Sequence, residues 1–428
     1  MTLSSADLAH LVAALILLLA AAHGCGYLFR RFRQPAVLGE VLGGLLLGPT
    51  VFGRLLPGWQ SWVFHDNLPT VTVLGAIYQL GLLLLMFSSG AEICALFRKG
   101  ERKAAALITL TGTALPFVFG LLLLRFIDTT PYLGAAQNRT AFALVFAIGV
   151  AVTSIPVISR ILYDLGLLET PFARIVLSAA VVEDVLLYVL VAIALSQVGG
   201  GNGSSYGVPG LLEIAGTSHL GLAYFTAVPL VFLLLSLLVG PIAYRWASSL
   251  RWNVLSQGSS IAYLLVILLL MTGMATSLGV TPMFGALMAG IVTGRTGEES
   301  EKPQQVIATF SFAFFIPIYF AIVGLKLDLI RAFSPRFFLL FLVFACVVKA
   351  LSIYLGARLA GESRVGAGNL AVAMNARGGP GIVLASLAYE SAIVSESFYT
   401  VLVMLSLVTS LLAGSWLDLV VRRGWKLR

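Results

Sequence analysis

The sequence is dominated by apolar runs long enough to cross a lipid bilayer, and these runs decide what the chain can fold into. One of them reads PFARIVLSAAVVEDVLLYVLVAIAL, over residues 171–195. Charged residues make up only 11% of the chain, against roughly a quarter in soluble proteins. In hydrocarbon only helices and closed barrels satisfy the backbone, and barrel strands would be short and alternating. We therefore predict an all-α polytopic membrane protein.

Polar stretches and Pro or Gly breaks divide these runs into thirteen candidate transmembrane helices of suitable length. The candidates cover residues 6–29, 35–53, 70–90, 104–126, 140–163, 171–197, 219–244, 253–276, 279–295, 305–325, 335–359, 366–389 and 397–420. Nineteen of the 27 Lys and Arg residues fall in loops on one side of this arrangement, and six on the other. Since cytoplasmic loops carry the excess positive charge, we expect the N-terminus outside and the C-terminus in the cytoplasm.

The rest of the composition excludes several classes of protein. The net charge of +8 is explained by basic cytoplasmic loops and does not indicate nucleic-acid binding. Three cysteines and four histidines are too scattered to predict a disulfide framework, a structural metal or a cofactor. The first ten residues contain no Lys or Arg, which argues against a cleaved signal peptide, so residues 6–29 are expected to remain as the first helix.

The spacing of glycines indicates an internal repeat. The second candidate helix reads LGEVLGGLLLGPT and the ninth reads FGALMAGIVTGRT, so that Gly39, Gly44 and Gly48 match Gly285, Gly290 and Gly294. Each set alone is explained by close helix packing. Their agreement predicts a duplication, and helices seven positions apart must run in opposite directions. Inverted repeats of this kind are typical of secondary transporters.

Two further helices carry matching signs of interruption. The fifth candidate contains VAVTSIPVISR with Pro156, and the twelfth contains NARGGPGIVLA with Gly378, Gly379 and Pro380. Proline removes a backbone donor, and glycine weakens a helix further. Paired kinks would explain this pattern. We favour discontinuous helices that cross at the midplane, where freed carbonyls and helix ends meet an ion.

Glu183 and Asp184 place two carboxyl groups deep within the sixth candidate helix. Charges at bilayer depth are costly and mark functional sites by default. Adjacent helix positions point about 100° apart, so one acid can face a cavity and the other a protein partner. A carboxyl group in low-dielectric surroundings can exchange a proton near neutral pH, and a cation competing for its oxygens would couple the two movements. We predict that Asp184 is this site, with Tyr188 as a hydrogen-bonding or packing neighbour, the alternative being an acid held permanently by Arg or Lys.

Glu183 has a candidate partner in Lys349, the single lysine inside the long apolar eleventh helix. An ion pair between them would neutralise both charges and leave Asp184 free. Lys349 lies too centrally to reach an interface easily by extending its side chain, which is the alternative. Asp184 itself could also be the partner of Lys349 in one protonation state.

Polar side chains at the two interruptions complete the candidate site. Thr153 and Ser154 could offer hydroxyl and carbonyl oxygens to a cation, although such residues often bond their own helix backbone. Arg377 has two open roles: compensating a helix C-terminus, or pairing with an acid such as Glu40 or Glu92.

At this point the sequence resembles a known family. The matching stretches are QPAVLGEVLGGLLLGP at 34–49, LGLLLLMFSSGAEI at 80–93, TSIPVISRILYDLGLLETPFARIVLSAAVVEDV at 153–185, LGVTPMFGALMAGIVTG at 278–294, FFIPIYFAIVGLKLDL at 314–329 and MNARGGPGIVLASLAYESAIV at 374–394. Together they resemble the cation:proton antiporter-2 family of Na⁺/H⁺ and K⁺/H⁺ exchangers, in order and over nearly the whole chain.

The resemblance implies a sodium/proton antiporter-like fold with thirteen helices, crossed broken helices in a mobile core domain, a dimerisation domain and elevator-like alternating access. By position, Asp184 falls on the family's essential ion-binding aspartate. Lys349 falls on the basic residue that pairs with the preceding position in electrogenic relatives. Glu183 departs from the Asp, Asn or Gln usual at that position, so the charge moved per cycle stays open.

These arguments predict one transmembrane antiporter domain over residues 1–428, without a C-terminal regulatory domain. An extra N-terminal helix (6–29) precedes a first inverted repeat (35–197), linking helices (219–276) and a second inverted repeat (279–420), each repeat having five helices. We expect a homodimer in the plasma (bacterial inner) membrane, in contact with membrane lipid.

The expected function is exchange of Na⁺ or K⁺ for protons in pH homeostasis, with Asp184 as the transient site of the metal cation and no cofactor. The alternative is a sodium-coupled symporter of an organic anion, in which Arg377 would bind the substrate. An enzyme is not expected, because the Gly-x-Gly-Asp pattern of an intramembrane aspartyl protease is missing from the sequence.

Overall fold

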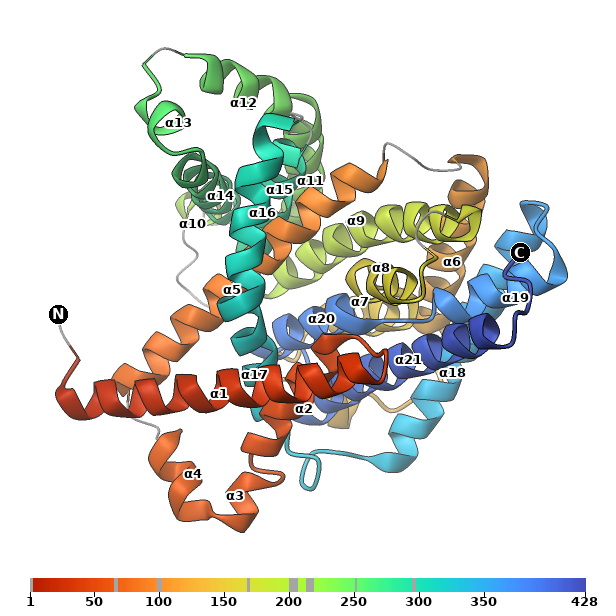
Figure 1. Ribbon diagram of the computed structural model, residues 1–428, viewed down its shortest axis with the longest axis horizontal. Coiled ribbons are helices and arrows are strands. Elements are labelled where there is room, and N and C mark those ends of the chain that lie inside the picture. The colour runs from red at the N-terminus through yellow and green to blue at the C-terminus, as the bar shows by residue number, and fades with distance from the viewer. Residues whose placement is uncertain are drawn as a thin grey trace.

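The computed structural model of the chain describes residues 3–64, 68–97, 102–167, 170–199, 207–212, 219–250, 252–294 and 298–428. Within these ranges the regular structure is helical, and an isolated bridge joins Leu133 to Val394. Long helices lie across one another in a broad bundle (Figure 1), and the shorter ones lie among them or at its edges. The predicted all-α class is therefore confirmed for the described residues.

The helices follow one another in this order: α1 (Ser5–Arg31), α2 (Ala36–Leu47), α3 (Phe52–Leu55), α4 (Pro57–Val63), α5 (Leu68–Phe97), α6 (Arg102–Leu123), η1 (Thr130–Tyr132), α7 (Arg139–Ala151), α8 (Ile155–Asp164), α9 (Pro171–Gly199), α10 (Val208–Leu211), α11 (His219–Leu238), α12 (Gly240–Ser249), α13 (Val254–Gly258), α14 (Ser260–Ser277), α15 (Pro282–Gly294), α16 (Glu298–Phe310), the π-helix η2 (Ser311–Phe315), α17 (Ile316–Leu325), α18 (Pro335–Leu359), α19 (Arg364–Ala373), α20 (Gly378–Glu390) and α21 (Glu396–Arg422).

Ten helical segments among the described residues are long and apolar enough to cross a membrane. An eleventh is the pair α11 and α12, which is bent by 47° at a break just before Gly240. Pro241 stands in the first turn of α12, where it cannot continue the hydrogen bonds of the preceding helix. The single span expected over 219–244 is therefore two helices. The chain is a multi-span integral membrane protein.

Glycines bring α2 and α15 unusually close to their neighbours. A Cβ atom at Gly44 would overlap the backbone carbonyl of Ala321 in α17, and one at Gly290 would overlap that of Phe87 in α5. No larger residue fits at either contact. The matched glycine spacing in the sequence thus serves close helix packing, with α2 against α17 and α15 against α5.

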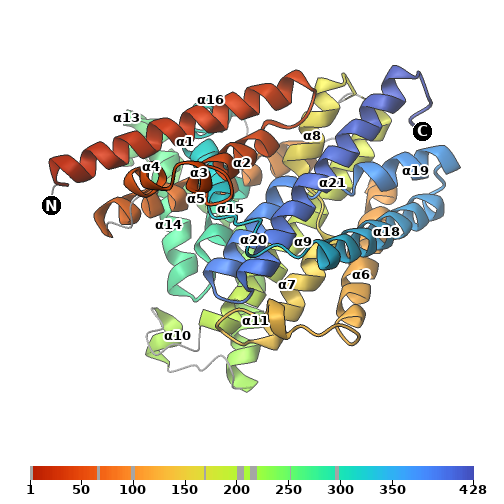
Figure 2. The same cartoon turned by 90° about the horizontal axis from the view of Figure 1, so that it is seen from below.

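Both predicted interruptions are present, and they touch each other. The chain is extended between α7 and α8, and a second break separates α19 from α20. The Ser154 backbone N–H donates to the carbonyl of Ala376 (2.7 Å), and the Thr153 hydroxyl donates to the carbonyl of Met374 (2.8 Å). Figures 1 and 2 both show α20 beside α7 and α9 in the interior. Two discontinuous helices are therefore joined at their breaks.

The residues expected to break these helices begin the second halves instead. Pro156 is the second residue of α8 and Pro380 the third of α20, positions in the first turn where a missing N–H removes no helical bond. Gly378 has a positive φ of 38°, and a Cβ there would overlap Val157 and lie 2.8 Å from the Ser154 hydroxyl oxygen. The crossing itself therefore requires glycine at position 378.

Candidate functional site

The acidic pair lies near the middle of α9 and is almost entirely buried. Glu183 is 2% exposed and Asp184 is 1% exposed. As adjacent helix residues they point in different directions. Glu183 forms an ion pair with Lys349 of α18, whereas Asp184 lies beside the first residue of α8. The two acids therefore have different partners, as the sequence predicted.

Lys349 is fully buried, and its ammonium group joins four helices. Its Nζ lies 2.9 Å from Oε2 of Glu183 and also donates to the carbonyls of Gly112 (2.8 Å) in α6 and Ala151 (2.6 Å) in α7. These three contacts use all three donors of the ammonium group. The pairing expected from the sequence is present, and the two carbonyl contacts are additional. The ammonium group of this buried ion pair is fully hydrogen-bonded, which offsets part of the cost of burying it, whereas Oε1 of Glu183 has no hydrogen-bond partner among the described residues.

Asp184 faces the positive end of a helix. Its carboxylate lies beside the backbone N–H of Ile155, the first residue of α8. An N-terminal helix end favours negative charge, so α8 stabilises the carboxylate without neutralising it. Oδ1 of Asp184 is buried and has no hydrogen-bond partner among the described residues. This oxygen is free to accept a proton or to coordinate a small cation.

Arg377 caps the C-terminal end of a helix and does not pair with an acid. Its guanidinium donates to the carbonyls of Gly149 (3.1 Å) and Val150 (3.0 Å) at the end of α7, to that of Ala345 (3.0 Å), and to Asn375 through its carbonyl (3.1 Å) and Oδ1 (2.8 Å). These contacts occupy all five N–H donors. The break leaves the last carbonyls of α7 without partners, which explains why a fully buried Arg is tolerated there.

The suggested pairing of Arg377 with Glu40 or Glu92 is therefore wrong, because no donor of Arg377 remains for a carboxylate. Glu40 is buried on α2 beside α1, where a Cβ at Gly26 would lie 3.6 Å from its Cγ. Glu92 lies near the end of α5 with an exposed side chain.

Oxygen atoms border the first break next to Asp184. Thr153 and Ser154 are fully buried, and the Ser154 hydroxyl accepts a hydrogen bond from the Val157 N–H (3.4 Å) at the start of α8. Tyr188, one turn beyond Asp184, lines a small cavity together with Val157 and Pro380. The cavity measures about 20 Å³, enough for roughly one water molecule. The wall of this cavity is mostly apolar, and Asp184 does not line it.

A second polar cluster was not predicted from the sequence. Lys326, at the end of α17, lies 3.0 Å from Oε1 of Glu390, the last residue of α20, and 4.4 Å above the ring of Tyr78. The Tyr78 and Tyr319 rings are 4.8 Å apart. Their hydroxyls and that of Ser386 are buried without hydrogen-bond partners among the described residues. These residues come from three distant segments, so no sequence spacing could connect them.

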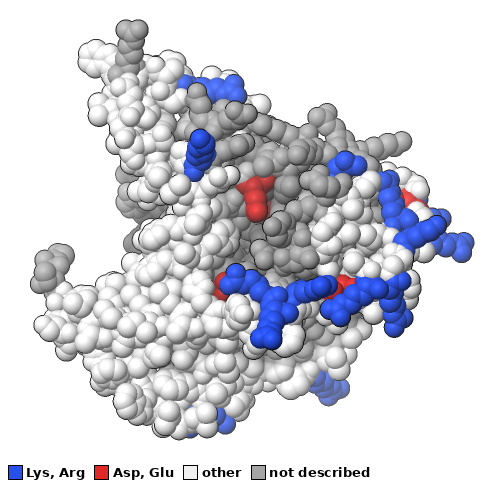
Figure 3. Space-filling view, in the orientation of Figure 1, with Lys and Arg blue, Asp and Glu red and all other residues white. Residues whose placement is uncertain are grey.

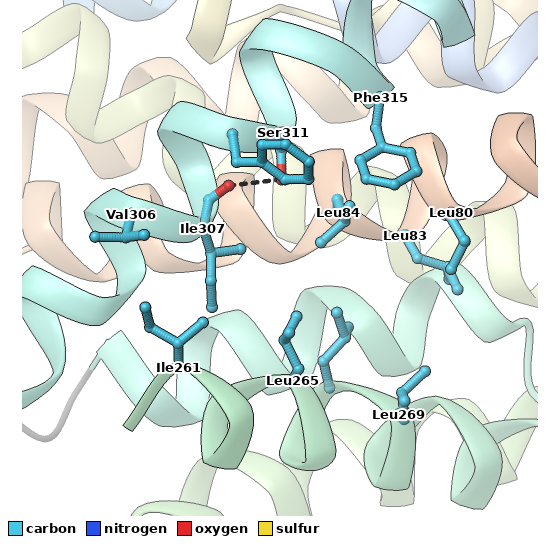
Figure 4. Close-up of a pocket in the computed structure, with 12 residues that line it drawn as sticks. Leu80, Leu83, Leu84, Ile261, Leu265, Leu269, Val306, Ile307, Ser311 and Phe315 are labelled. Carbon is cyan, nitrogen blue, oxygen red and sulfur yellow. Dashed lines mark hydrogen bonds between the residues drawn. The ribbon is translucent and has the colours of Figure 1, made fainter. Parts of the chain in front are cut away.

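A larger cavity nearby has a different character. It has a volume of about 380 Å³ and lies between α5, α14 and the turn where α16 passes into η2 (Figure 4). Apolar side chains line most of it, and the Ser311 hydroxyl in its wall donates to the carbonyl of Ile307 (2.7 Å). No charged residue lines this cavity, so it offers no path for an ion.

The face of the molecule drawn in Figure 3, called here the basic face, carries a row of basic side chains. Figure 3 shows them along the rim of a hollow that contains an acidic side chain. Arg33 and Arg422, after α1 and at the end of α21, both bind Asp418, at 3.0 Å and 2.7 Å. Two basic residues far apart in the sequence therefore meet at one acid.

Comparison with known proteins identifies the family to which this chain belongs. The family profile described as "Sodium/hydrogen exchanger, transmembrane" matches residues 14–423. The chain belongs to this family. It is similar to the Na(+)/H(+) antiporter NhaS4 of Synechocystis, with 27% identity over 94% of this chain and 95% of that protein. It is also similar to an Na(+)/H(+) antiporter of Enterococcus hirae, with 28% identity over 93% of this chain and 95% of that protein.

Further relatives extend the range of named cations and confirm the fold. The K(+)/H(+) antiporter 1 of Saccharomyces cerevisiae is 27% identical over 89% of this chain, but the match spans only 43% of the yeast protein. The solved structure of the sodium proton antiporter MjNhaP1 from Methanocaldococcus jannaschii superimposes with a TM-score of 0.59 at 13% identity, covering 97% of this chain and 98% of that one. The described helices therefore share the fold of a known antiporter, and the family consists of transporters rather than enzymes.

Proposed function

We propose that this protein exchanges a monovalent cation, Na⁺ or K⁺, for protons across a membrane by alternating access, with Asp184 as the shared binding site. The observation that carries this proposal is the free Oδ1 of Asp184 at a helix break, beside an acid already neutralised by Lys349. The relatives named as Na⁺/H⁺ and K⁺/H⁺ antiporters support it.

Exchange follows from competition for one carboxylate. A proton on Asp184 removes the charge that a cation needs, and a bound cation displaces the proton. Thr153 and Ser154 could add oxygen ligands, because each hydroxyl oxygen keeps a lone pair after its observed hydrogen bond. Each passage of the site from one side of the membrane to the other then carries either a cation or a proton.

The sodium-coupled symporter is less well supported. It would need Arg377 to bind the carboxylate of an organic substrate. All five N–H donors of Arg377 are already bound to backbone carbonyls and to Asn375, and breaking them would expose the end of α7.

The finer architecture that we propose is the inverted pair of repeats, 35–197 and 279–420, within thirteen transmembrane helices. Two observations support it. First, α2 packs on α17 while α15 packs on α5, so equivalent helices exchange partners between the halves. Second, each half contains one broken helix, and the two breaks bond to each other. Helix 6–29 and the linking helices 219–276 would lie outside the repeats.

We further propose a homodimer in the plasma (bacterial inner) membrane, with the N-terminus outside and the C-terminus in the cytoplasm. The basic face in Figure 3 supports this orientation, since positive charge gathers on the cytoplasmic side.

The function is tested with purified protein in proteoliposomes that contain a pH-sensitive dye. Gradients of Na⁺, K⁺ and Li⁺ are imposed one at a time, and the proton movement is followed. We expect at least one cation to drive protons in the opposite direction, and the most effective one identifies the substrate. If none of the three cations drives proton movement, and an organic anion is taken up in a sodium-dependent way, the symporter is favoured.

Alternating access also requires a seal on each side of the site, and we assign one of these seals to Lys326, Glu390 and Tyr78. The Lys326–Glu390 pair lies beside the ring of Tyr78, and the hydroxyls of Tyr78 and Tyr319 have no hydrogen-bond partners among the described residues. A partly exposed pair contributes up to about 1 kcal/mol, or roughly fivefold in an equilibrium between two states.

We therefore expect Lys326→Gln and Glu390→Gln each to change the apparent KM for the cation by up to about fivefold. The double variant should be no more affected than either single variant, because both remove one interaction. Arg331→Gln is the matched control, since Arg331 lies 4.0 Å from Asp328 on an exposed loop and should leave KM unchanged. Additive effects in the double variant would contradict the assignment.

A further inference from the structure

A basic, tryptophan-lined cavity lies away from the transport site. It has a volume of about 590 Å³ and is formed by α19, α21 and the segment 424–428. Figure 1 shows α19 and the C-terminal segment together at one edge of the molecule. Arg364, Val365, Gly368, Asn369, Val372, Trp416, Trp425 and Lys426 line it. Neither Asp184 nor Lys349 contributes to this cavity.

Hydrogen bonds hold the walls of the cavity in place. The Trp416 indole N–H donates to Oδ1 of Asn369 (3.1 Å), and the Asn369 amide donates to the backbone carbonyls of Lys426 (3.1 Å) and Leu427 (3.2 Å). The Trp416 and Trp425 rings are 6.5 Å apart. One buried amide thus fixes an indole and the C-terminal segment together, so the cavity is a formed feature rather than a gap between loose side chains.

The charges of the cavity are not balanced. Arg364 and Lys426 have exposed side chains, and no carboxylate among the described residues pairs with either. The nearby acid Glu362 is already bound by Arg428 through two contacts, at 2.8 Å and 2.7 Å. Because such a bidentate pair neutralises the carboxylate, Glu362 does not offset the charges of Arg364 and Lys426.

The position of the cavity points to the membrane interface. The apolar span of α21 ends at Arg422, and the span that includes α19 begins at Arg364. Tryptophan is enriched at this depth, and basic pockets between transmembrane helices bind anionic head groups. Val365 and Val372 provide apolar wall beside the two cations. The cavity is therefore cationic on one side and apolar on the other.

We infer that this cavity binds the head group of an anionic phospholipid. The phosphate lies between Arg364 and Lys426, and the glycerol and the first methylene groups lie against Trp416, Trp425 and Val372. A free phosphate would match the two cations but leave the indoles and valines without a partner. Because α19 is the first half of a discontinuous helix, a bound lipid would hold that half against α21.

The experiment measures lipid binding to the whole protein. Purified protein in a neutral detergent is titrated with short-chain phosphatidylglycerol, with phosphatidylcholine of the same chain length, and with inorganic phosphate alone. Bound lipid is counted by native mass spectrometry, and the shift in Tm is recorded in parallel. We expect saturable binding of phosphatidylglycerol, and neither binding nor stabilisation by the other two probes at the same concentration.

Two variants with equal loss of charge test the location. Each basic group near the surface contributes about fivefold in affinity, so Arg364→Gln/Lys426→Gln should bind phosphatidylglycerol roughly 30-fold more weakly. The control Arg331→Gln/Arg336→Gln removes two exposed cations elsewhere and should bind like the wild type. The Tm without lipid shows whether each variant is folded. If Arg364→Gln/Lys426→Gln is not folded, the single variant Arg364→Glu is used in its place.

Two results would overturn the inference. Equal binding of phosphatidylglycerol by both double variants would show that the lipid is attracted by overall charge. Stabilisation by inorganic phosphate at the same concentrations as by phosphatidylglycerol would show that the site recognises free phosphate and not lipid. Neither measurement involves transport, so the outcome is separate from that of the proposed exchange.

Discussion

Replacing Asp184 with asparagine should reduce cation-driven proton movement to the level of empty liposomes. The amide has nearly the same size and can still lie beside the Ile155 N–H, but it carries neither a negative charge nor a carboxyl group that can bind and release a proton. Both halves of the proposed exchange need the carboxylate. The measurement is the dye-based assay with the cation that drives the wild-type protein best, at equal protein density in the membrane.

The matched control is Asp418→Asn, the same substitution at an acid that binds Arg33 and Arg422 at the surface. It should exchange at the wild-type rate. If Asp184→Asn keeps its wild-type Tm and still exchanges ions, Asp184 is not the shared site. Competition between proton and cation for Asp184 also predicts a pH effect in the wild-type protein. Lowering the pH should raise the KM for the cation without lowering the maximal rate, since excess cation displaces the proton.

The sequence predicted the main features of the site because membrane burial makes polar residues conspicuous. Within an apolar helix, Glu183, Asp184 and Lys349 stood out individually, and charge balance suggested a pair between Lys349 and Glu183, with Asp184 as the alternative partner. The breaks near 156 and 378 were visible because proline and glycine act locally on the backbone. Predictions of this kind depend on a single residue in its own helix.

What the sequence could not predict depends on contacts between distant segments. Two roles for Arg377 fitted equally well, and only the carbonyls of Gly149 and Val150 at the end of α7 decide between them. The Lys326–Glu390 pair lies at two helix ends that come together only in the folded chain. The proline positions indicated the breaks but not their exact location, because proline is accommodated in the first turn after a break.

Replacing Lys349 with methionine should destabilise the protein strongly. The substitution keeps a long side chain but leaves Glu183 buried without its cation, and it removes the donor to the carbonyls of Gly112 and Ala151. Removing one partner of a buried ion pair costs about 3–5 kcal/mol, although protonation of the orphaned acid would reduce that cost. The loss is measured as a decrease in Tm of the purified protein in detergent.

The same substitution at Lys326 is the matched control. Lys326 also forms an ion pair at 3.0 Å, but its side chain is 36% exposed, whereas that of Lys349 is fully buried. Water can replace the lost partner of Glu390, so Lys326→Met should cost at most about 1 kcal/mol. A similar decrease in Tm for both variants would mean that burial does not govern the strength of the Lys349 pair.

A second change should rescue the first. Glu183→Gln removes the charge that Lys349→Met leaves behind, so the double variant should recover most of the lost stability. Recovery should be incomplete, because the carbonyls of Gly112 and Ala151 still lack a donor. A double variant as unstable as Lys349→Met alone would show that the carbonyl contacts, and not the charge of Glu183, are what Lys349 stabilises. The size of the recovery therefore separates the ion pair from the joining of α6 and α7 that the same ammonium group provides.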